Sequence, residues 1–370
     1  MKPAKALAVA ASDGNLKSMR ALLKKDGELA SDWQPIMDAC FAGQAAAVAL
    51  LLKYGADPNV KSKSAHQYRP LHRTVEYKKT LPKHEGHGKV LDLLLKAGAD
   101  PMMRGSYWCI SAVTVSATGD CRQYLPALVK AAPGPLDIFH ACVLGETARV
   151  KTLLKKDRLL ASTPDTGSRI WTSEEGWFPL HYCARSHVGD DDTKKGRALA
   201  QITQLLLDHG ADPTGCVDQA VGNLAVLEAL LLAGGKVADD DTVHHAACEG
   251  HVEALKLLME HGTALDGTRG TDHHGGYTPL GCAVSSRSVQ GAQWFLEQGQ
   301  NPNKIKGKEG ENCLHVAVHY GASDKMLALL LEHGAKPNQK DKQGRTPLKR
   351  AREKKHKKAI AYLEGVGATG

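Results

Sequence analysis

One phrase recurs along this chain of 370 residues and constrains its fold more than any other feature. A leucine-rich apolar run ends in two or three polar residues and is followed by Gly-Ala-Asp-Pro or a close variant. Clear copies occupy residues 49–59, 93–101, 205–213 and 329–338. The copies of its glycine at Gly262, Gly299 and Gly334 are 37 and 35 residues apart. Self-similarity at a period of this length predicts a repeat protein, in which small units stack on one another.

Each repeat carries signals for two helices. A proline-containing phrase precedes several of the leucine runs, at residues 69–72, 178–181, 277–280 and 346–348. Proline suits the first turn of a helix, and Thr278 and Thr346 stand just before it, where a hydroxyl can cap free amides. Gly55 and Gly98 follow the leucine runs, where a helix end favours a left-handed residue. We therefore expect each unit to run helix, tight turn, helix, loop.

These phrases resemble the ankyrin repeat, whose pattern is Asp-x-x-Gly-x-Thr-Pro-Leu-His-x-Ala followed by a leucine-rich helix ending in Gly-Ala-Asp. Residues 341–348 match the opening of that pattern. The resemblance extends over essentially the whole chain. It implies an all-α solenoid of about eleven stacked helix-turn-helix units with finger loops between them. The units begin near residues 4, 35, 69, 105, 135, 177, 215, 240, 277, 310 and 344.

The array has one candidate division. Residues 14–31 and 145–162 are identical at 9 of 18 positions, so the fifth unit repeats a sequence type used at the N-terminus. A Pro-Gly-Pro junction lies shortly before it, at residues 133–135. This pattern predicts N-terminal repeats over 1–132 and C-terminal repeats over 133–370, the latter ending in a basic capping repeat. The alternative is one continuous array over 1–370.

The sequence offers little for catalysis. The cysteines at 40, 142, 183, 248 and 282 recur near the end of a unit's first helix, where a free cysteine behaves as a small buried hydrophobe. There is no Cys-x-x-Cys, and the histidine clusters lack metal-ligand spacing. We therefore expect no enzyme, with no catalytic residue, no cofactor and no metal site. By the resemblance, His72, His181 and His315 occupy a position where imidazole ties neighbouring loops together.

The chain contains no run of about 18 apolar residues, so we expect no membrane span. Its nine cysteines are odd in number and scattered singly, which is atypical of a secreted disulfide framework. These features favour a cytoplasmic, intracellular protein.

Net charge is concentrated at one end of the sequence. Residues 336–358 hold eleven basic and two acidic residues, and this segment accounts for the whole net charge of +8. A terminal repeat needs a polar outer face, which explains such residues as a solvated cap. The alternative is a nucleic-acid or phosphate site. Its candidate anion-binding residues are Lys349, Arg350, Arg352, Lys354 and Lys355.

Aromatic residues make up 5% of the chain, yet several fall between the repeats. In the family, such finger loops and the first helices line a concave face, and Trp, Tyr and Arg dominate interface hot spots. We therefore predict a non-catalytic scaffold that binds a protein partner through its concave face and these finger loops. The sequence does not choose between an inhibitor or immunity protein and a tether. The predicted partner-binding residues are Trp33, Tyr68, Arg69, Tyr107, Trp108, Arg169, Trp171, Trp177, Phe178, His273, His274 and Tyr277.

Overall fold

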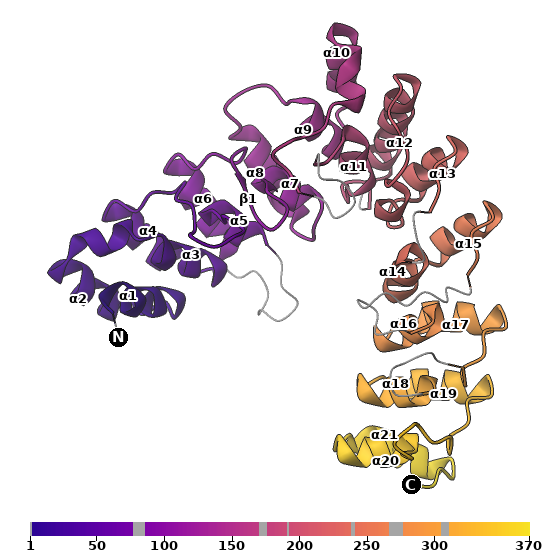
Figure 1. Cartoon of the computed structure of the whole chain (residues 1–370). Helices are drawn as coiled ribbons and strands as arrows, with labels where there is room; N and C mark the ends of the chain where they lie inside the picture. Colours follow the sequence, from indigo (N-terminus) through magenta and orange to yellow (C-terminus); the bar gives the residue numbers. More distant parts are fainter. Residues whose placement is uncertain are drawn as a thin grey trace. The chain divides into compact units, whose positions relative to one another are not determined.

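The computed structural model describes residues 2–76, 86–169, 176–190, 192–237, 241–265, 277–304 and 311–370. Its contacts group the chain into two compact units, Met1–Asp212 and Pro213–Gly370. In each unit, helices follow one another in short pairs (Figure 1). The described elements form eleven such pairs, which confirms the predicted helical repeat solenoid.

Among its described residues, the first unit has six helix pairs and one small sheet. Its elements are α1 (Pro3–Ser12), α2 (Leu16–Lys25), η1 (Gly27–Ser31), α3 (Trp33–Phe41), α4 (Ala45–Lys53), α5 (Pro70–Val75), α6 (His87–Lys96), β1 (Arg104–Gly105), β2 (Ile110–Ser111), α7 (Ala112–Ala117), η2 (Arg122–Tyr124), α8 (Leu125–Lys130), α9 (Ile138–Val143), α10 (Thr147–Lys156), η3 (Arg158–Ser162), α11 (Pro179–Ala184) and α12 (Thr193–Asp208).

The second unit contains five pairs. Its elements are η4 (Val217–Gln219), α13 (Leu224–Leu232), α14 (Asp241–Glu249), α15 (Val252–Glu260), α16 (Pro279–Ser285), α17 (Val289–Glu297), α18 (Cys313–His319), α19 (Asp324–Glu332), α20 (Pro347–Glu353) and α21 (Lys357–Gly365). The first pair is short because its first helix is the single 3-10 turn η4.

Helix boundaries follow the local sequence signals. Pro279 and Pro347 occupy the first helical turn of α16 and α20. The hydroxyls of Thr278 and Thr346 each accept a backbone N–H three residues on, at 3.2 Å, which confirms both predicted caps. Gly55, after α4, has a φ of 87°, a left-handed conformation that costs glycine little.

The core lies between like helices of neighbouring pairs. First helices pack on first helices, from α1 against α3 to α9 against α11, and from α14 to α20. Leucine, alanine and valine fill the interior, and Leu51, Leu94, Leu206 and Leu330 are fully buried. The recurring cysteines at 40, 142, 183 and 282 are also buried, as predicted, whereas Cys248 is partly exposed. The apolar surface removed from water between pairs is what stabilises the stack.

Histidines tie consecutive repeats together through their loops. The Nε2 atom of His72 donates to the Ile110 carbonyl at 2.9 Å, and Nε2 of His315 donates to the Arg345 carbonyl at 2.9 Å. Nε2 of His244 reaches the Tyr277 carbonyl at 3.0 Å in the same way. The predicted role of His72 and His315 in joining neighbouring loops is confirmed.

One feature, a small sheet, was not expected from the sequence. The loop before α7 forms a two-stranded antiparallel sheet, in which Arg104 pairs with Ser111 and Gly105 with Ile110. The chain reverses between these strands because Ser106 and Cys109 take left-handed φ values of 72° and 52°. In addition, residues 133–135 lie inside the first unit, where α7 before them packs against α9 after them. The two contact-defined units meet in the sequence after Asp212.

Candidate functional site

Three finger loops of the first unit meet beside helices α5, α7 and α11. They are the loop before α5 (residues 59–69), the loop before α7 (residues 100–111) and the described part of the loop before α11 (residues 163–169 and 176–178). A backbone hydrogen bond connects the loops before α7 and α11, and a second one lies within the loop before α11. The Arg169 N–H donates to the Trp108 carbonyl at 2.8 Å, and the Asp165 N–H donates to the Trp177 carbonyl at 2.7 Å. The loop before α11 is thereby folded back on itself and joined to its neighbour.

Two arginines brace these loops from within. Arg69 donates from Nε to the Arg104 carbonyl at 2.8 Å and from Nη1 to the Asn59 carbonyl at 2.5 Å. Arg104 forms a two-point ion pair with Asp165, one contact of which is 2.9 Å from Nη1 to Oδ2. Arg69 was predicted to contact a partner. In the described structure its side chain donates to backbone carbonyls of the loops. Arg104 and Asp165 were not predicted, because no local pattern relates residues 61 positions apart.

Aromatic rings form a continuous series across the same loops. The ring of His66 lies 4.8 Å from that of Tyr107, which meets Trp108 edge-on at 4.9 Å. Trp108 in turn lies 6.1 Å from Trp177. The guanidinium of Arg185 is 5.0 Å from the ring of Trp108 and 5.0 Å from that of Trp177. Such cation–π contacts hold the indoles in place. We call Tyr68, Tyr107, Trp108, Arg169 and Trp177 the finger cluster.

Members of the finger cluster differ in exposure. Tyr107 is 37% exposed, and Arg169 is also exposed. Tyr68 and Trp108 are half-buried. Trp177 is fully buried, and its Nε1 donates to the Arg169 carbonyl at 2.5 Å. The expectation that Trp177 contacts a partner is therefore corrected: it supports the loop from inside.

The remaining predicted partner-binding residues lie elsewhere. Phe178 is half-buried at the start of α11, and Trp33 is half-buried at the start of α3. Tyr277 belongs to the second unit, and its hydroxyl donates to Glu311 at 3.3 Å. Trp171, His273 and His274 lie outside the described residues. The structure thus brings together the predicted residues of three loops, not the whole predicted set.

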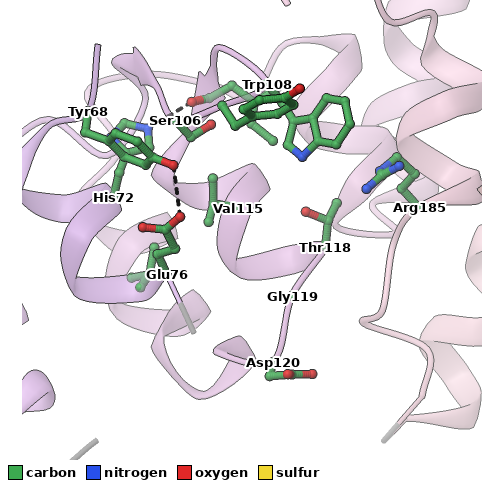
Figure 2. A pocket seen from close by; sticks show the side chains of 13 residues that line it. Tyr68, His72, Glu76, Ser106, Trp108, Val115, Thr118, Gly119, Asp120 and Arg185 are labelled. Carbon is green, nitrogen blue, oxygen red and sulfur yellow. Dashed lines mark hydrogen bonds between the residues drawn. The ribbon is translucent and has the colours of Figure 1, made fainter. Parts of the chain in front are cut away.

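A pocket of about 240 Å³ lies beside the finger cluster. Figure 2 shows its wall, with Tyr68 and Glu76 at one end and Arg185 at the other. The Tyr68 hydroxyl donates to Glu76 Oε1 at 2.9 Å, and burial together with that carboxylate raises the pKa of Tyr68 to about 12. Burial lowers the pKa of His72 to about 4, so this imidazole is neutral at pH 7.

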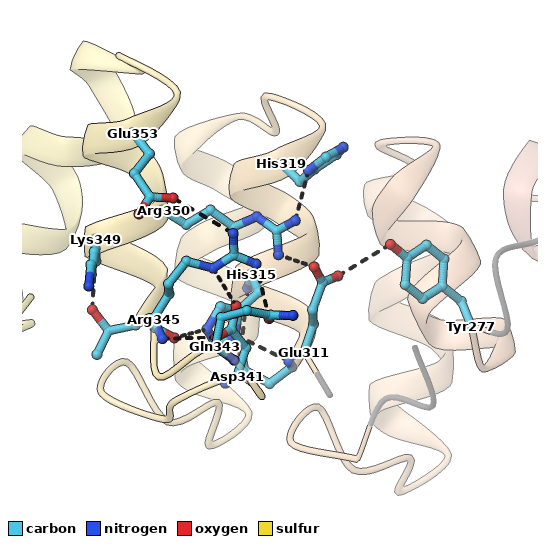
Figure 3. Close-up of polar contacts among 12 residues, drawn as sticks. Tyr277, Glu311, His315, His319, Asp341, Gln343, Arg345, Lys349, Arg350 and Glu353 are labelled. Carbon is cyan, nitrogen blue, oxygen red and sulfur yellow. Dashed lines mark hydrogen bonds and ion pairs between the residues drawn. The ribbon is translucent and has the colours of Figure 1, made fainter. Parts of the chain in front are cut away.

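The basic C-terminal repeat divides into structural and exposed charges. Arg350 is buried and paired with buried Glu311, and its Nη2 lies 3.0 Å from His319 Nδ1 (Figure 3). The expectation that Arg350 binds an anion is therefore corrected, because its charge is already matched inside the stack. Arg352 pairs with Glu364 at 2.8 Å on the surface.

The other three candidate anion-binding residues are lysines at the surface. Lys349, Lys354 and Lys355 are exposed, and no ion pair holds them within the described residues. Across the same described ranges, no group of three or more His, Cys, Asp or Glu side chains is placed to hold a metal ion. None of the described helices is long and apolar enough to cross a membrane.

Comparison with known families agrees with this architecture. A family model described as "Ankyrin repeats (3 copies)" matches residues 2–62, 215–306 and 292–368. A second, described as "Ankyrin repeat", matches residues 175–219. These matches cover more than half of the chain. The chain therefore belongs to the ankyrin repeat family.

Similar proteins are diverse. The chain is 33% identical over 127 residues to NF-kappa-B inhibitor cactus of Drosophila yakuba, covering 33% of this chain and 24% of that protein. It is 35% identical over 109 residues to human ankyrin repeat and SOCS box protein 3, covering 29% of this chain and 20% of that protein. It is 33% identical over 97 residues to human transient receptor potential cation channel subfamily A member 1, covering 26% and 8%.

The chain thus spans a quarter or less of the length of each of these relatives. Among solved structures, the human ASB11 ankyrin repeat domain aligns with a TM-score of 0.49 and 20% identity. That alignment covers 62% of this chain and 98% of that one. Ankyrin repeats are in general protein-interaction modules.

Proposed function

We propose that this chain is a non-catalytic scaffold that binds a protein partner through its finger loops and first helices, with the finger-cluster residues other than Trp177 as a principal contact. The observation that carries the proposal is the convergence of Tyr68, Tyr107 and Trp108 from consecutive loops onto one pocketed surface. Tyrosine, tryptophan and arginine are the residue types that dominate binding energy at interfaces.

The finger cluster is also preorganised. The Arg104–Asp165 ion pair, the buried Trp177 and the Arg169 N–H bond to Trp108 fix the loops before any partner arrives. A surface that is already ordered loses little conformational entropy on binding, so more of its contact energy contributes to affinity. This arrangement suits recognition of a folded or extended protein segment.

Within this function, the matched relative named NF-kappa-B inhibitor cactus supports an inhibitory form of binding, in which the scaffold covers a partner's working surface. We also place the function inside the cell. All nine cysteines are free thiols, which suits a reducing compartment.

The experiment is capture of partners by the immobilised full chain at physiological salt after nuclease treatment, with quantitative mass spectrometry. We expect Tyr107→Ala combined with Arg169→Ala to lower capture of the dominant partner at least about tenfold. Leu159→Ala is the matched control, because Leu159 is 67% exposed in the same unit but outside the finger cluster. Equal capture by both variants would contradict the proposed contact surface.

A second candidate function is phosphate or nucleic-acid binding by the C-terminal repeat, favoured by the exposed Lys349, Lys354 and Lys355. Affinity that rests on phosphate contacts falls steeply as salt rises, whereas an aromatic protein interface responds weakly. Loss of all captured material after nuclease treatment would select this function over the first.

A further inference from the structure

The pocket beside the finger cluster contains buried polar atoms that have no partner. Ser106 and His72 both line it and are 6% and 1% exposed. The Ser106 hydroxyl and the His72 Nδ1 atom make no hydrogen bond in the structure. A buried polar atom without a partner destabilises the fold, and two such atoms belong to residues that line this one pocket. Ser106 also holds a left-handed φ of 72°, the kind of backbone strain that concentrates at functional sites.

The unpartnered Nδ1 atom of His72 can only accept a hydrogen bond. Its Nε2 must carry the ring proton, because it donates to the Ile110 carbonyl. The neutral imidazole therefore presents a lone pair at Nδ1. Since burial lowers the pKa of His72 to about 4, this lone pair stays unprotonated at neutral pH.

The neighbouring groups add further acceptors. Glu76 accepts one hydrogen bond from Tyr68 and one from Arg73, which leaves lone pairs on both carboxylate oxygens. Thr118 donates its hydroxyl proton to the Thr114 carbonyl, so its oxygen can only accept. Asp120 is exposed at the pocket, and no hydrogen bond or ion pair engages its carboxylate within the described residues. The pocket thus offers many acceptors and negative charge.

Two arginines lie at or beside the pocket, and they differ in position and pairing. Arg73 Nη1 lies 2.6 Å from Glu76 Oε2, whereas the Tyr68 hydroxyl donates to Glu76 Oε1. Arg185 lies by Trp108, at the end of the pocket opposite Tyr68 and Glu76 (Figure 2). The end formed by Tyr68, Glu76 and Ser106 is therefore where a group rich in donors fits.

We propose that this end of the pocket binds the guanidinium group of an arginine side chain supplied by the protein partner. A guanidinium has five N–H donors and no acceptor, is always charged, and stacks on aromatic faces such as those of Tyr68 and Tyr107. A lysine ammonium has three donors around a single atom and matches flat walls with dispersed acceptors less well. The inference rests on the proposed function, because it names the chemistry by which the finger cluster recognises its partner.

The test uses the full chain and N-acetyl-arginine amide. The capped ends of this probe make it resemble an arginine residue within a peptide. The probe is titrated into the protein up to tens of millimolar. Binding is monitored through shifts of the tryptophan indole N–H signals in nuclear magnetic resonance spectra. We expect a saturable shift with the arginine probe, and weaker binding of N-acetyl-lysine amide and of N-acetyl-citrulline amide, the neutral analogue. Free arginine should bind no better than the capped form.

Two variants locate the binding. Ser106→Gly removes the hydroxyl and suits the left-handed backbone, so it folds, and we expect roughly tenfold weaker binding of the probe. Asp120→Asn should weaken binding severalfold by removing charge. Asp13→Asn, at another exposed aspartate of the same unit, is the control and should change nothing.

The proposal is overturned if the arginine probe gives no saturable shift, if the citrulline probe binds equally well, or if Ser106→Gly binds the probe as the parent chain does. Tighter binding of free arginine would also overturn it, because recognition would then include an amino-acid backbone. If these results occur while Tyr107→Ala with Arg169→Ala still abolishes partner capture, the arginine assignment fails and the proposed function stands.

Discussion

Two repeats, one from each unit, use the same histidine position differently. In the second unit, His315 donates from Nε2 to the next loop and accepts at Nδ1 from the Asn312 N–H at 3.2 Å. In the first unit, His72 makes the same outward bond, but its Nδ1 has no partner. Both nitrogens of the His315 ring are hydrogen-bonded, whereas the His72 ring, which lines a pocket, keeps one unpartnered nitrogen.

The difference originates one turn upstream, at the residue that precedes each helix. Asn312 caps α18 with its side chain and offers its N–H to the histidine, and the Phe178 N–H serves His181 in the same way at 3.0 Å. Arg69 makes no side-chain cap for α5 and turns toward the finger loops. His72 and His315 thus share the Nε2 bond to the next loop and differ in the Nδ1 bond within their own repeat. Binding chemistry can be added at Nδ1.

The buried ion pair of the second unit should give the largest stability effect. Glu311→Gln leaves Arg350 charged and unmatched in the interior and should lower the free energy of unfolding by about 3–5 kcal/mol. Glu76→Gln breaks the partly exposed pair with Arg73 and should cost about 1 kcal/mol or less. Urea denaturation of both variants checks the contrast, which equal losses would refute.

Acidification should act through His72. The unfolded chain protonates this imidazole near its ordinary pKa of 6.5, whereas the folded pKa is about 4. Its contribution to stability is thus complete above pH 6.5 and is lost as the pH falls toward 4, by about 3 kcal/mol in all. Urea denaturation at several pH values should show a shallower decline for His72→Gln, whose amide can keep the bond to Ile110.

The same substitution at His315 sharpens the comparison at neutral pH. His315→Gln loses the bond from the Asn312 N–H, whereas His72→Gln has no corresponding bond to lose. The His315 variant should therefore be the less stable of the two by about 1 kcal/mol at pH 7. The reverse order would mean that the open nitrogen of His72 is more important for the fold than its contacts indicate.

Ser106→Gly should stabilise the first unit by about 1 kcal/mol, since it relieves a left-handed φ and removes an unpartnered hydroxyl. Lys355→Gly is the counterpart in the second unit, at a φ of 57° on the exposed end of α20. The midpoint temperature of unfolding should rise for both variants, but only Ser106→Gly should weaken binding of the arginine probe. A destabilised Ser106→Gly would show that its hydroxyl already serves the fold.

The smallest effect is expected at the exposed lysines. Lys349→Glu with Lys354→Glu should change the free energy of unfolding by no more than about 0.5 kcal/mol, because neither side chain is packed or paired in the described structure. Partner capture should also persist. A large loss of capture would instead assign binding to the C-terminal repeat.

The sequence predicted the repeats well because their signals are local. Proline, threonine and glycine mark the ends of α16, α20 and α4 within a few residues of each boundary. The candidate site was predicted only in part. Trp177 belongs to the expected loop, but its burial depends on a bridge to Asp165 twelve residues earlier. Arg350 and Lys349 are adjacent in sequence and differ only in which one faces α18, a distinction set by packing.

The histidine links have a further consequence for how this chain acquires its structure. They join residues 38, 33 and 30 positions apart, so each bond closes a short stretch between neighbouring repeats. Chains whose contacts are close in sequence have little loop-closure entropy to overcome and fold quickly. Ordering can begin at several places and spread to adjacent repeats. A nascent chain can thus form native links soon after each pair of repeats leaves the ribosome, long before synthesis is complete.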